Sequence, residues 1–386
     1  MRAPVMNVQP ILLFVALSLA LGVGCGGSSS SSSSSSTSTS SFSSTSSSSG
    51  GSGSKGGGNG SAWVRVGNTG MLNDLWIQFD KSGNLYASSS RYGLAVSRDQ
   101  GVNWMQLNTG MAQSCHDGMG LAADGTVLAG DEYCSANPHS FYWLNNVNGN
   151  GTVWTAANTN SVLNTGAFVN NPTLAHNGAI VTGSFNGIWT STDNGRSYQR
   201  SPGAPALGTY GEAVSAFTGP DGTVYIGTAL KGVLYSLDNG LSFRTLGYPS
   251  SWGAVDAMDF AIVPQGPFQG WLLVGFGSSH EVYCYGPLPP TGGTWKPCKN
   301  GLPGADVEQF ATNLSKSKVF VVHAKGGGVF SSSDGQNWTA ANSGLPPDSS
   351  QPFGQADVRS IATDPSSGVM YVILNGGDVY KTSSPQ

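Results

Sequence analysis

Six acidic residues recur along the chain, each near the start of a short run of residues typical of a β-strand. Carboxylates that converge from several strands bind a cation, accept hydrogen bonds from sugar hydroxyls, or act as a general acid and base pair. The simpler interpretation is a set of solvated polar residues around a water-filled opening, and the sequence leaves it open. The six residues are Asp74, Asp117, Glu212, Asp256, Glu308 and Asp357.

Five aromatic residues fall in loops expected around the same opening. Their rings would stack on sugar rings or peptide side chains, or would anchor the loops that carry them, and the sequence does not choose between these roles. Together with the acidic residues they form the predicted ligand-binding set. They are Tyr92, Phe185, Tyr210, Trp252 and Phe353.

No catalytic residue, metal site or cofactor is predicted, although a cation bound by the acidic residues is an alternative. The five histidines show no HExxH pattern and are interpreted as isolated polar residues. They are His116, His139, His176, His280 and His323.

The elements that position these residues are revealed by a second pattern, which combines Ser, Asp, Gly and a closing aromatic residue. Four copies begin at Ser97, Ser191, Ser236 and Ser332. We refer to them as the Ser–Asp turns. Their members are Ser97, Asp99, Gly101 and Trp104; Ser191, Asp193, Gly195 and Tyr198; Ser236, Asp238, Gly240 and Phe243; and Ser332, Asp334, Gly335 and Trp338.

Two degenerate copies end at Trp154 and Trp295, so that six closing aromatic residues are spaced by 50, 44, 45, 52 and 43 residues. A period in this range is typical of a propeller or solenoid. Short runs rich in Val, Ile, Tyr, Phe and Trp between Gly-rich turns predict an all-β fold with four strands in each unit.

The sequence predicts seven blades over residues 62–386. The last unit, from "DVRSIATD" to the C-terminus, has three strands, whereas "SAWVRVGNTG" around Trp63 has the closing aromatic and its turn without a blade before it. The N-terminal segment is therefore expected to supply the outer strand of the last blade. This pairing would close the ring and protect its edges.

The aspartates of the Ser–Asp turns are predicted to be structural. A short carboxylate in a tight turn accepts backbone N–H bonds, and glycine permits a positive φ. The alternative, catalysis or metal binding, requires convergence on one place. Turns repeated at the blade period lie at separate places around the rim and cannot converge.

The turns resemble the Asp-box, also called the bacterial neuraminidase repeat. The last unit resembles repeats of Asp-box propellers such as sortilin, xyloglucanases and the photosystem II assembly factors. The resemblance covers residues 62–386 and implies a seven-bladed propeller. It implies little about function, because such propellers have unrelated activities.

The N-terminal part of the chain is typical of an exported lipoprotein. Residues 1–24 have the composition of a signal peptide, and "LGVGC" resembles a bacterial lipobox with Cys25 as the lipidated residue. Cleavage without lipidation remains the alternative. Residues 25–61 form a Ser/Gly-rich, low-complexity tether. We therefore expect a bacterial outer-membrane or cell-surface lipoprotein, bound to the membrane through its anchor.

The charge of the chain indicates which partners it does not bind, and its cysteines indicate the redox compartment in which it folds. Charged residues make up 10% of the chain and the net charge is −4, so the basic stripe of a nucleic-acid-binding protein is absent. We expect a monomer. Two disulfides are predicted from strand positions, Cys115–Cys134 and Cys284–Cys298.

The predicted function is binding or assembly without catalysis, with a glycan or protein recognised at the mouth of the central channel. A glycoside hydrolase is the alternative. A sialidase is disfavoured because its chemistry needs three arginines that converge on a carboxylate. Of the seven arginines in the domain, only Arg91 and Arg359 are expected near the channel.

Overall fold

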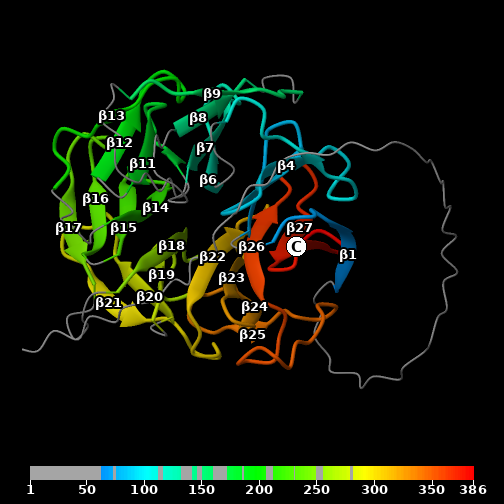
Figure 1. Ribbon diagram of the computed structural model, residues 1–386. Helices are drawn as coiled ribbons and strands as arrows, with labels where there is room; N and C mark the ends of the chain where they lie inside the picture. The colour runs from blue at the N-terminus through cyan, green and yellow to red at the C-terminus, as the bar shows by residue number, and fades with distance from the viewer. Residues whose placement is uncertain are drawn as a thin grey trace, which may run out of the picture. The chain divides into compact units, whose positions relative to one another are not determined.

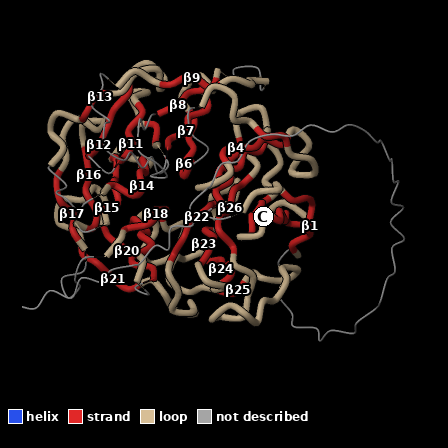
Figure 2. Tube along the Cα trace, viewed as in Figure 1, coloured by secondary structure: helices blue, strands red, loops and turns tan. Residues whose placement is uncertain are grey.

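The computed structural model describes residues 62–72, 75–111, 116–131, 141–145, 150–159, 172–184, 187–205, 212–229, 231–248, 255–278 and 281–386. They form strands, turns and loops, and none of them lies in a helix (Figure 2). Within this part of the chain there is accordingly no helix able to cross a membrane. The predicted signal peptide, Cys25 and the tether lie outside the described residues.

The strands form seven antiparallel sheets of four strands each. We call the sheets blades 1–7 in chain order, and we give the strands of each blade from the innermost to the outermost. Blade 1 contains β2 (Leu75–Phe79), β3 (Leu85–Ser89), β4 (Gly93–Ser97) and β5 (Met105–Gln106). Blade 2 contains β6 (His116–Leu121), β7 (Val127–Asp131), β8 (Phe141–Leu144) and β9 (Trp154–Ala156). Blade 3 contains β10 (Thr173–Leu174), β11 (Ile180–Ser184), β12 (Gly187–Ser191) and β13 (Gln199–Arg200). Blade 4 contains β14 (Ala213–Thr218), β15 (Val224–Thr228), β16 (Gly232–Ser236) and β17 (Arg244–Gly247).

The remaining blades follow the same order. Blade 5 contains β18 (Ala257–Ile262), β19 (Leu272–Phe276), β20 (Glu281–Gly286) and β21 (Thr294–Pro297). Blade 6 contains β22 (Val307–Thr312), β23 (Val319–His323), β24 (Gly328–Ser332) and β25 (Thr339–Ala340). Blade 7 contains β26 (Val358–Thr363), β27 (Met370–Leu374), β28 (Asp378–Thr382) and, from the other end of the chain, β1 (Trp63–Asn68).

The blades are arranged as a closed seven-bladed propeller. Each inner strand contacts the inner strand of the next blade, from β2 through β26 and back to β2. Both faces of the second strand of most blades are therefore covered, and strands such as β15, β19 and β27 are buried along their whole length. This burial explains their nearly continuous apolar sequences.

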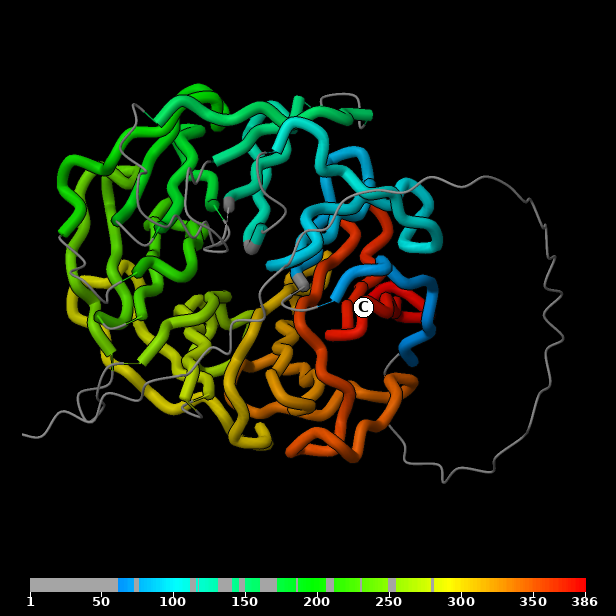
Figure 3. Tube along the Cα trace, viewed as in Figure 1, coloured from blue at the N-terminus to red at the C-terminus, as the bar shows by residue number. Residues whose placement is uncertain are grey.

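The N-terminal strand closes the ring, as the sequence predicted. β1 pairs antiparallel with β28, with Trp63 opposite Thr382 and Asn68 opposite Asp378. Figures 1 and 3 show β1 beside the C-terminal strands. The Trp63 side chain is 4% exposed. The unpaired edge that β28 would otherwise present is thus covered.

The Ser–Asp turns are closed by their own side chains. In the turn at Ser191, the serine hydroxyl donates to Asp193 Oδ1 at 2.8 Å and accepts from the Gly195 N–H at 2.9 Å. The Asp193 carboxylate also accepts from the Ser197 N–H at 2.8 Å. The turns at Ser97, Ser236 and Ser332 repeat this arrangement. The carboxylate of each aspartate therefore accepts hydrogen bonds within its own turn.

The same turns join neighbouring blades. The backbone N–H groups of Tyr198 and Trp338 donate to carbonyls of the preceding blade, at Asn158 and Asn300. Gly195 has φ +85°, and a Cβ there would lie 2.3 Å from Leu128 in the blade before it. Glycine is thus required both by the backbone conformation and by the approach of the blades.

One of the two predicted disulfides lies among the described residues. Cys284 on β20 is bonded to Cys298, and both are fully buried in the core between blades 5 and 6. The bond joins the third strand of blade 5 to the end of its outer strand. Cys115 and Cys134 lie outside the described residues, so their pairing stays a prediction.

Candidate functional site

Four acidic residues occupy the same structural position in four successive blades, directly before or at the start of the inner strand. The backbone carbonyl of each accepts a hydrogen bond from the residue that follows the second strand of its own blade. The bonds are 3.0 Å from Ala229 to Glu212, 3.0 Å from Gly277 to Asp256, 3.0 Å from Ala324 to Asp306 and 2.9 Å from Asn375 to Asp357. We call these four residues the mouth acids, because they surround the end of the channel at which the inner strands begin.

In blades 2 and 6 the predicted acidic residues lie near the start of the inner strand, as expected, but not at the mouth position itself. Asp306, which the sequence analysis missed, takes the mouth position of blade 6, and Glu308 lies two residues further, inside β22. Asp117 is likewise the second residue of β6 rather than the residue before it. Glu308 instead lies at the bulge that follows the first residue of β14, β18, β22 and β26, here between Val307 and Gln309. Asp74 lies outside the described residues.

Two cations compensate the charge on one side of the mouth. Arg359 Nη1 lies 3.0 Å from Glu308 Oε1 and 3.9 Å from Asp357 Oδ1, and all three side chains are less than 20% exposed. Lys325 contacts acidic residues of two blades. Its Nζ lies 3.4 Å from Asp306, and its backbone N–H donates to Asp357 at 3.0 Å. Arg359, one of the two arginines that the sequence predicted near the channel, therefore lies beside the mouth acid Asp357.

On the other side of the mouth, Glu212 and Asp256 have no ion pair with any described residue. Burial raises the pKa of Glu212, and the nearby charge of Asp256 raises it further. Burial likewise raises the pKa of Asp256, with a further contribution from Asp306. The charges of neighbouring blades therefore influence one another.

Two of the five predicted aromatic residues are described, and both are exposed. Tyr92 is 44% exposed in the turn between β3 and β4, and Phe353 is 38% exposed in a long loop before β26. That loop is held to the Lys325 turn by a bond from Gln355 N–H to the Gly326 carbonyl at 3.1 Å. Phe353 thus belongs to a loop bonded to the mouth. Phe185, Tyr210 and Trp252 lie outside the described residues.

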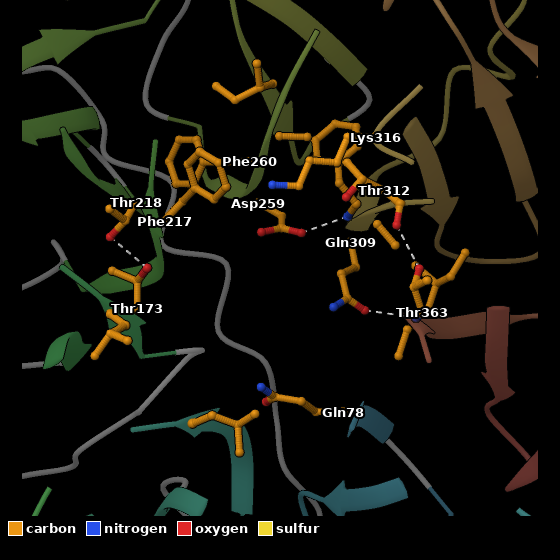
Figure 4. A pocket seen from close by; sticks show the side chains of 18 of the residues that line it. Gln78, Thr173, Phe217, Thr218, Asp259, Phe260, Gln309, Thr312, Lys316 and Thr363 are labelled. Carbon is orange, nitrogen blue, oxygen red and sulfur yellow. Dashed lines mark hydrogen bonds between the residues drawn. The ribbon is translucent and has the colours of Figure 1, made fainter. Parts of the chain in front are cut away.

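A cavity of about 1140 Å³ extends from the middle of the inner strands to their far end. We call it the channel cavity; its described walls come from all seven blades. Figure 4 shows Gln78, Asp259, Gln309 and Lys316 around it, with Phe217 and Phe260 together in one wall. The mouth acids do not line the channel cavity, so the channel has two chemically different ends.

Side chains on four inner strands form hydrogen bonds between neighbouring blades along the channel wall. Each of these residues lies two positions after the first residue of its strand. Ser215 Oγ donates to the Ala257 carbonyl at 2.9 Å, and Asp259 Oδ2 accepts from the Phe310 N–H at 2.7 Å. Gln309 Oε1 accepts from the Ile361 N–H at 2.9 Å, and Ser360 Oγ accepts from the Ile77 N–H at 3.0 Å. Each bond joins one blade to the next. Asp259 is the charged member of this set.

Metal binding has no support within the described residues, where no group of three or more His, Cys, Asp or Glu side chains is arranged to hold an ion. His116 and His323 are buried and their Nδ1 atoms lie 3.3 and 3.2 Å from backbone carbonyls. Burial lowers the pKa of His323 to about 4. Both are core residues in this structure.

No family model and no curated protein matches the sequence. Solved propeller structures do match. The extracellular domain of a putative hybrid two-component system from B. thetaiotaomicron has a TM-score of 0.61 at 12% identity, over 83% of this chain and 40% of that one. The GH74 xyloglucanase from Xanthomonas campestris has a TM-score of 0.58 at 15% identity, over 84% of this chain and 54% of that one. The chain thus spans about half or less of the length of both.

A third comparison covers nearly the whole of the other protein. YCF48 from Cyanidioschyzon merolae has a TM-score of 0.56 at 13% identity, over 83% of this chain and 98% of that one. The three proteins share the propeller fold, although one is an extracellular domain of a two-component system and another is a xyloglucanase. At these identities the likeness establishes the propeller fold alone.

Proposed function

We propose that this chain is an extracytoplasmic binding propeller, tethered to a membrane surface, that recognises a glycan or protein at the channel mouth without catalysis. The observation that carries the proposal is the placement of Glu212, Asp256, Asp306 and Asp357 at one position in four successive blades. Repetition of a carboxylate at one position builds a surface on which several blades contact one ligand. Concave sites with a few placed polar groups are where ligands usually bind.

The tether and anchor complete the proposal. A lipidated Cys25 followed by a Ser/Gly-rich segment would hold the propeller away from the membrane. The buried Cys284–Cys298 disulfide supports an oxidising, extracytoplasmic location. The Ser–Asp turns, which we assign to the Asp-box class, serve as blade-to-blade connections and leave the mouth free to bind.

A glycoside hydrolase is the second candidate, and one observation favours it. Glu212 and Asp256 are neighbouring, partly buried carboxyl groups whose pKa values are both raised. A carboxyl group with a raised pKa is the usual general acid of a glycosidase, and a second carboxylate acts as nucleophile or base. A sialidase remains disfavoured, because its chemistry needs three convergent arginines and the Arg359 side chain is already paired with Glu308.

One experiment separates the two candidates. The purified protein is applied to a glycan array and a peptide library, and in parallel to a panel of chromogenic glycosides, together with the Glu212→Gln and Asp256→Asn variants. The binding proposal expects a ligand on an array, weakened by both variants, and no glycoside turnover. Turnover that both variants abolish would instead establish the hydrolase.

A further inference from the structure

The channel cavity contains a carboxylate whose charge the fold does not require. Asp259 Oδ2 joins blade 5 to blade 6 by accepting one N–H bond from Phe310. In the next blade the neutral amide of Gln309 performs the same task, accepting from Ile361. A neutral acceptor is thus sufficient for the connection. The negative charge and the second oxygen of Asp259 exceed what the connection needs.

No cation of the described chain compensates this charge. Asp259 forms no ion pair with any described residue, although Lys81, His176 and Lys316 also line the cavity. Lys81 Nζ is bonded to the Ala123 carbonyl, and Lys316 lies in the turn after β22, at the far end of the channel. Asp80, the other acidic residue of the described wall, accepts bonds from its own turn, at Ser82 and Asn84.

The surroundings of Asp259 disfavour a bare charge. Burial raises the pKa of Asp259 to about 7, although backbone hydrogen bonds from Phe310 and Phe260 act in the opposite direction. A partly buried carboxylate is costly unless a positive partner is present. The site would therefore be completed by a cation that enters from the channel.

The adjacent wall suits an organic cation better than a metal ion. The rings of Phe217 and Phe260 are stacked, with centroids 6.2 Å apart and planes inclined by 26°. Figure 4 shows both beside Asp259. Aromatic faces attract ammonium groups, and no group of metal-binding side chains lies among the described residues.

Polar groups on the remaining walls suit a ligand with hydroxyl or amide groups. The Gln78 side-chain amide makes no hydrogen bond within the described part of the chain, and Figure 4 shows it at the cavity. Thr173 and Thr218, whose hydroxyls lie 2.9 Å apart, line the same space. These groups would hold the uncharged part of a ligand while Asp259 holds its ammonium group.

We propose that the channel cavity is a second binding site, separate from the mouth, for a small protonated amine that carries hydroxyl or amide groups. Asp259 pairs with the ammonium group, Phe217 contacts it through its ring face, and Gln78 binds a polar group of the ligand. The site is independent of whether the mouth binds a glycan or a protein.

The test uses ethanolamine and β-alaninamide, whose amines are protonated at both pH 8 and pH 5.5, with ethylene glycol and propionamide as their uncharged counterparts. Binding to the purified protein is measured by calorimetry and by thermal shift at pH 8. We expect at least one amine to bind about tenfold or more tightly than its uncharged counterpart. Asp259→Asn keeps the acceptor for Phe310 and should weaken amine binding about tenfold or more. Asp378→Asn, at a carboxylate that pairs with Arg65 and does not line the cavity, serves as the matched control and should bind like the parent.

Acidification provides a second readout. Protonation of Asp259 removes its charge, so amine affinity should fall about tenfold or more between pH 8 and pH 5.5. The fall should be absent in Asp259→Asn, which has no carboxyl group to protonate at this position. The proposal is overturned if no amine binds, if charged and uncharged members bind equally, or if Asp259→Asn binds the amines as the parent does.

Discussion

The indole Nε1 of Trp63 donates a 2.6 Å hydrogen bond to the carbonyl of Ala341, which lies 278 residues later in the chain. Trp338 and Trp154 make the corresponding bonds to Cys298 and Leu107 of the blades before their own. Trp63 therefore acts as the closing aromatic residue of blade 7, although it stands at the opposite end of the chain from the other strands of that blade.

This connection predicts a large cost for removing the ring of Trp63. Trp63→Ala should lower the free energy of unfolding by about 3–5 kcal/mol, because a buried aromatic side chain and its hydrogen bond are both lost. Val64→Ala, at a side chain that is 50% exposed, is the control and should change stability by about 0.5 kcal/mol or less. Chemical denaturation measures both. Equal effects of the two variants would contradict ring closure by β1.

The Ser–Asp turns predict a loss of stability in acid. Burial opposes ionisation of Asp334, but hydrogen bonds from Asn337, Gln336 and Ser332 outweigh it and lower the pKa to about 2. A carboxyl group with a lowered pKa in the folded state stabilises the protein above its unfolded pKa of about 3.9 and loses this effect as the pH falls toward 2. Asp334→Asn should therefore cost about 1 kcal/mol at pH 7 and almost nothing at pH 2. A cost that is equal at both pH values would contradict this account.

The ion pairs of Arg359 indicate that the carboxylates at the mouth need a compensating positive charge. Arg359→Met would leave Glu308 and Asp357, both mostly buried, without this partner, and should lower the free energy of unfolding by about 2 kcal/mol. Arg65→Met breaks a pair of similar length with Asp378, but its side chains are 54% and 34% exposed. This control should cost less than about 1 kcal/mol. Thermal melts of both variants at pH 7 test the difference.

The cysteines predict two cross-links in the exported protein. Peptide mapping without reduction should recover Cys284–Cys298, which the structure contains, and also Cys115–Cys134, which remains a prediction. Replacing Cys284 and Cys298 together by serine should cost about 3 kcal/mol by the chain-entropy account. Free thiols at all four positions would contradict an oxidising location.

Asp259 predicts a gain of stability when its charge is removed. Its pKa is about 7 in the fold. Because this value is raised above the unfolded value of about 3.9, ionisation weakens the fold progressively as the pH rises from 4 through 7. Asp259→Asn should therefore be more stable than the parent at pH 8, by about 1–2 kcal/mol, and no more stable at pH 4. Denaturant midpoints at the two pH values measure this.

Much of the fold was predictable from the sequence because each repeat ends in a recognisable turn and a closing aromatic residue. Closing aromatic residues at intervals of 43–52 residues define the blades, and the solitary Trp63 indicates where the ring closes. The position of individual side chains was less predictable. In "GADVEQF" two acidic residues flank one valine. Only the start of β22 at Val307, together with the bond from the Ala324 N–H to the Asp306 carbonyl, shows that Asp306 rather than Glu308 takes the mouth position.

Asp259 was missed for a related reason. Within "AMDFAI" a single acid in an apolar strand resembles an ordinary solvent-facing residue. The signal lies in the comparison of blades, since Ser215, Gln309 and Ser360 stand at the same offset in their strands and all bond to the next blade. Such a comparison requires the inner-strand register, which the structure supplies.

The central claim is that the channel mouth binds and the Ser–Asp turns only hold the blades together. The most direct measurement compares two variants of the purified protein on the same glycan array and peptide library, with melting temperatures recorded alongside. The Glu212→Gln, Asp256→Asn double variant should lose binding about tenfold or more with an unchanged or higher melting temperature. Asp193→Asn should melt earlier while its folded fraction binds like the parent. Loss of binding in Asp193→Asn at an unchanged melting temperature, with full binding by the mouth variant, would contradict the account.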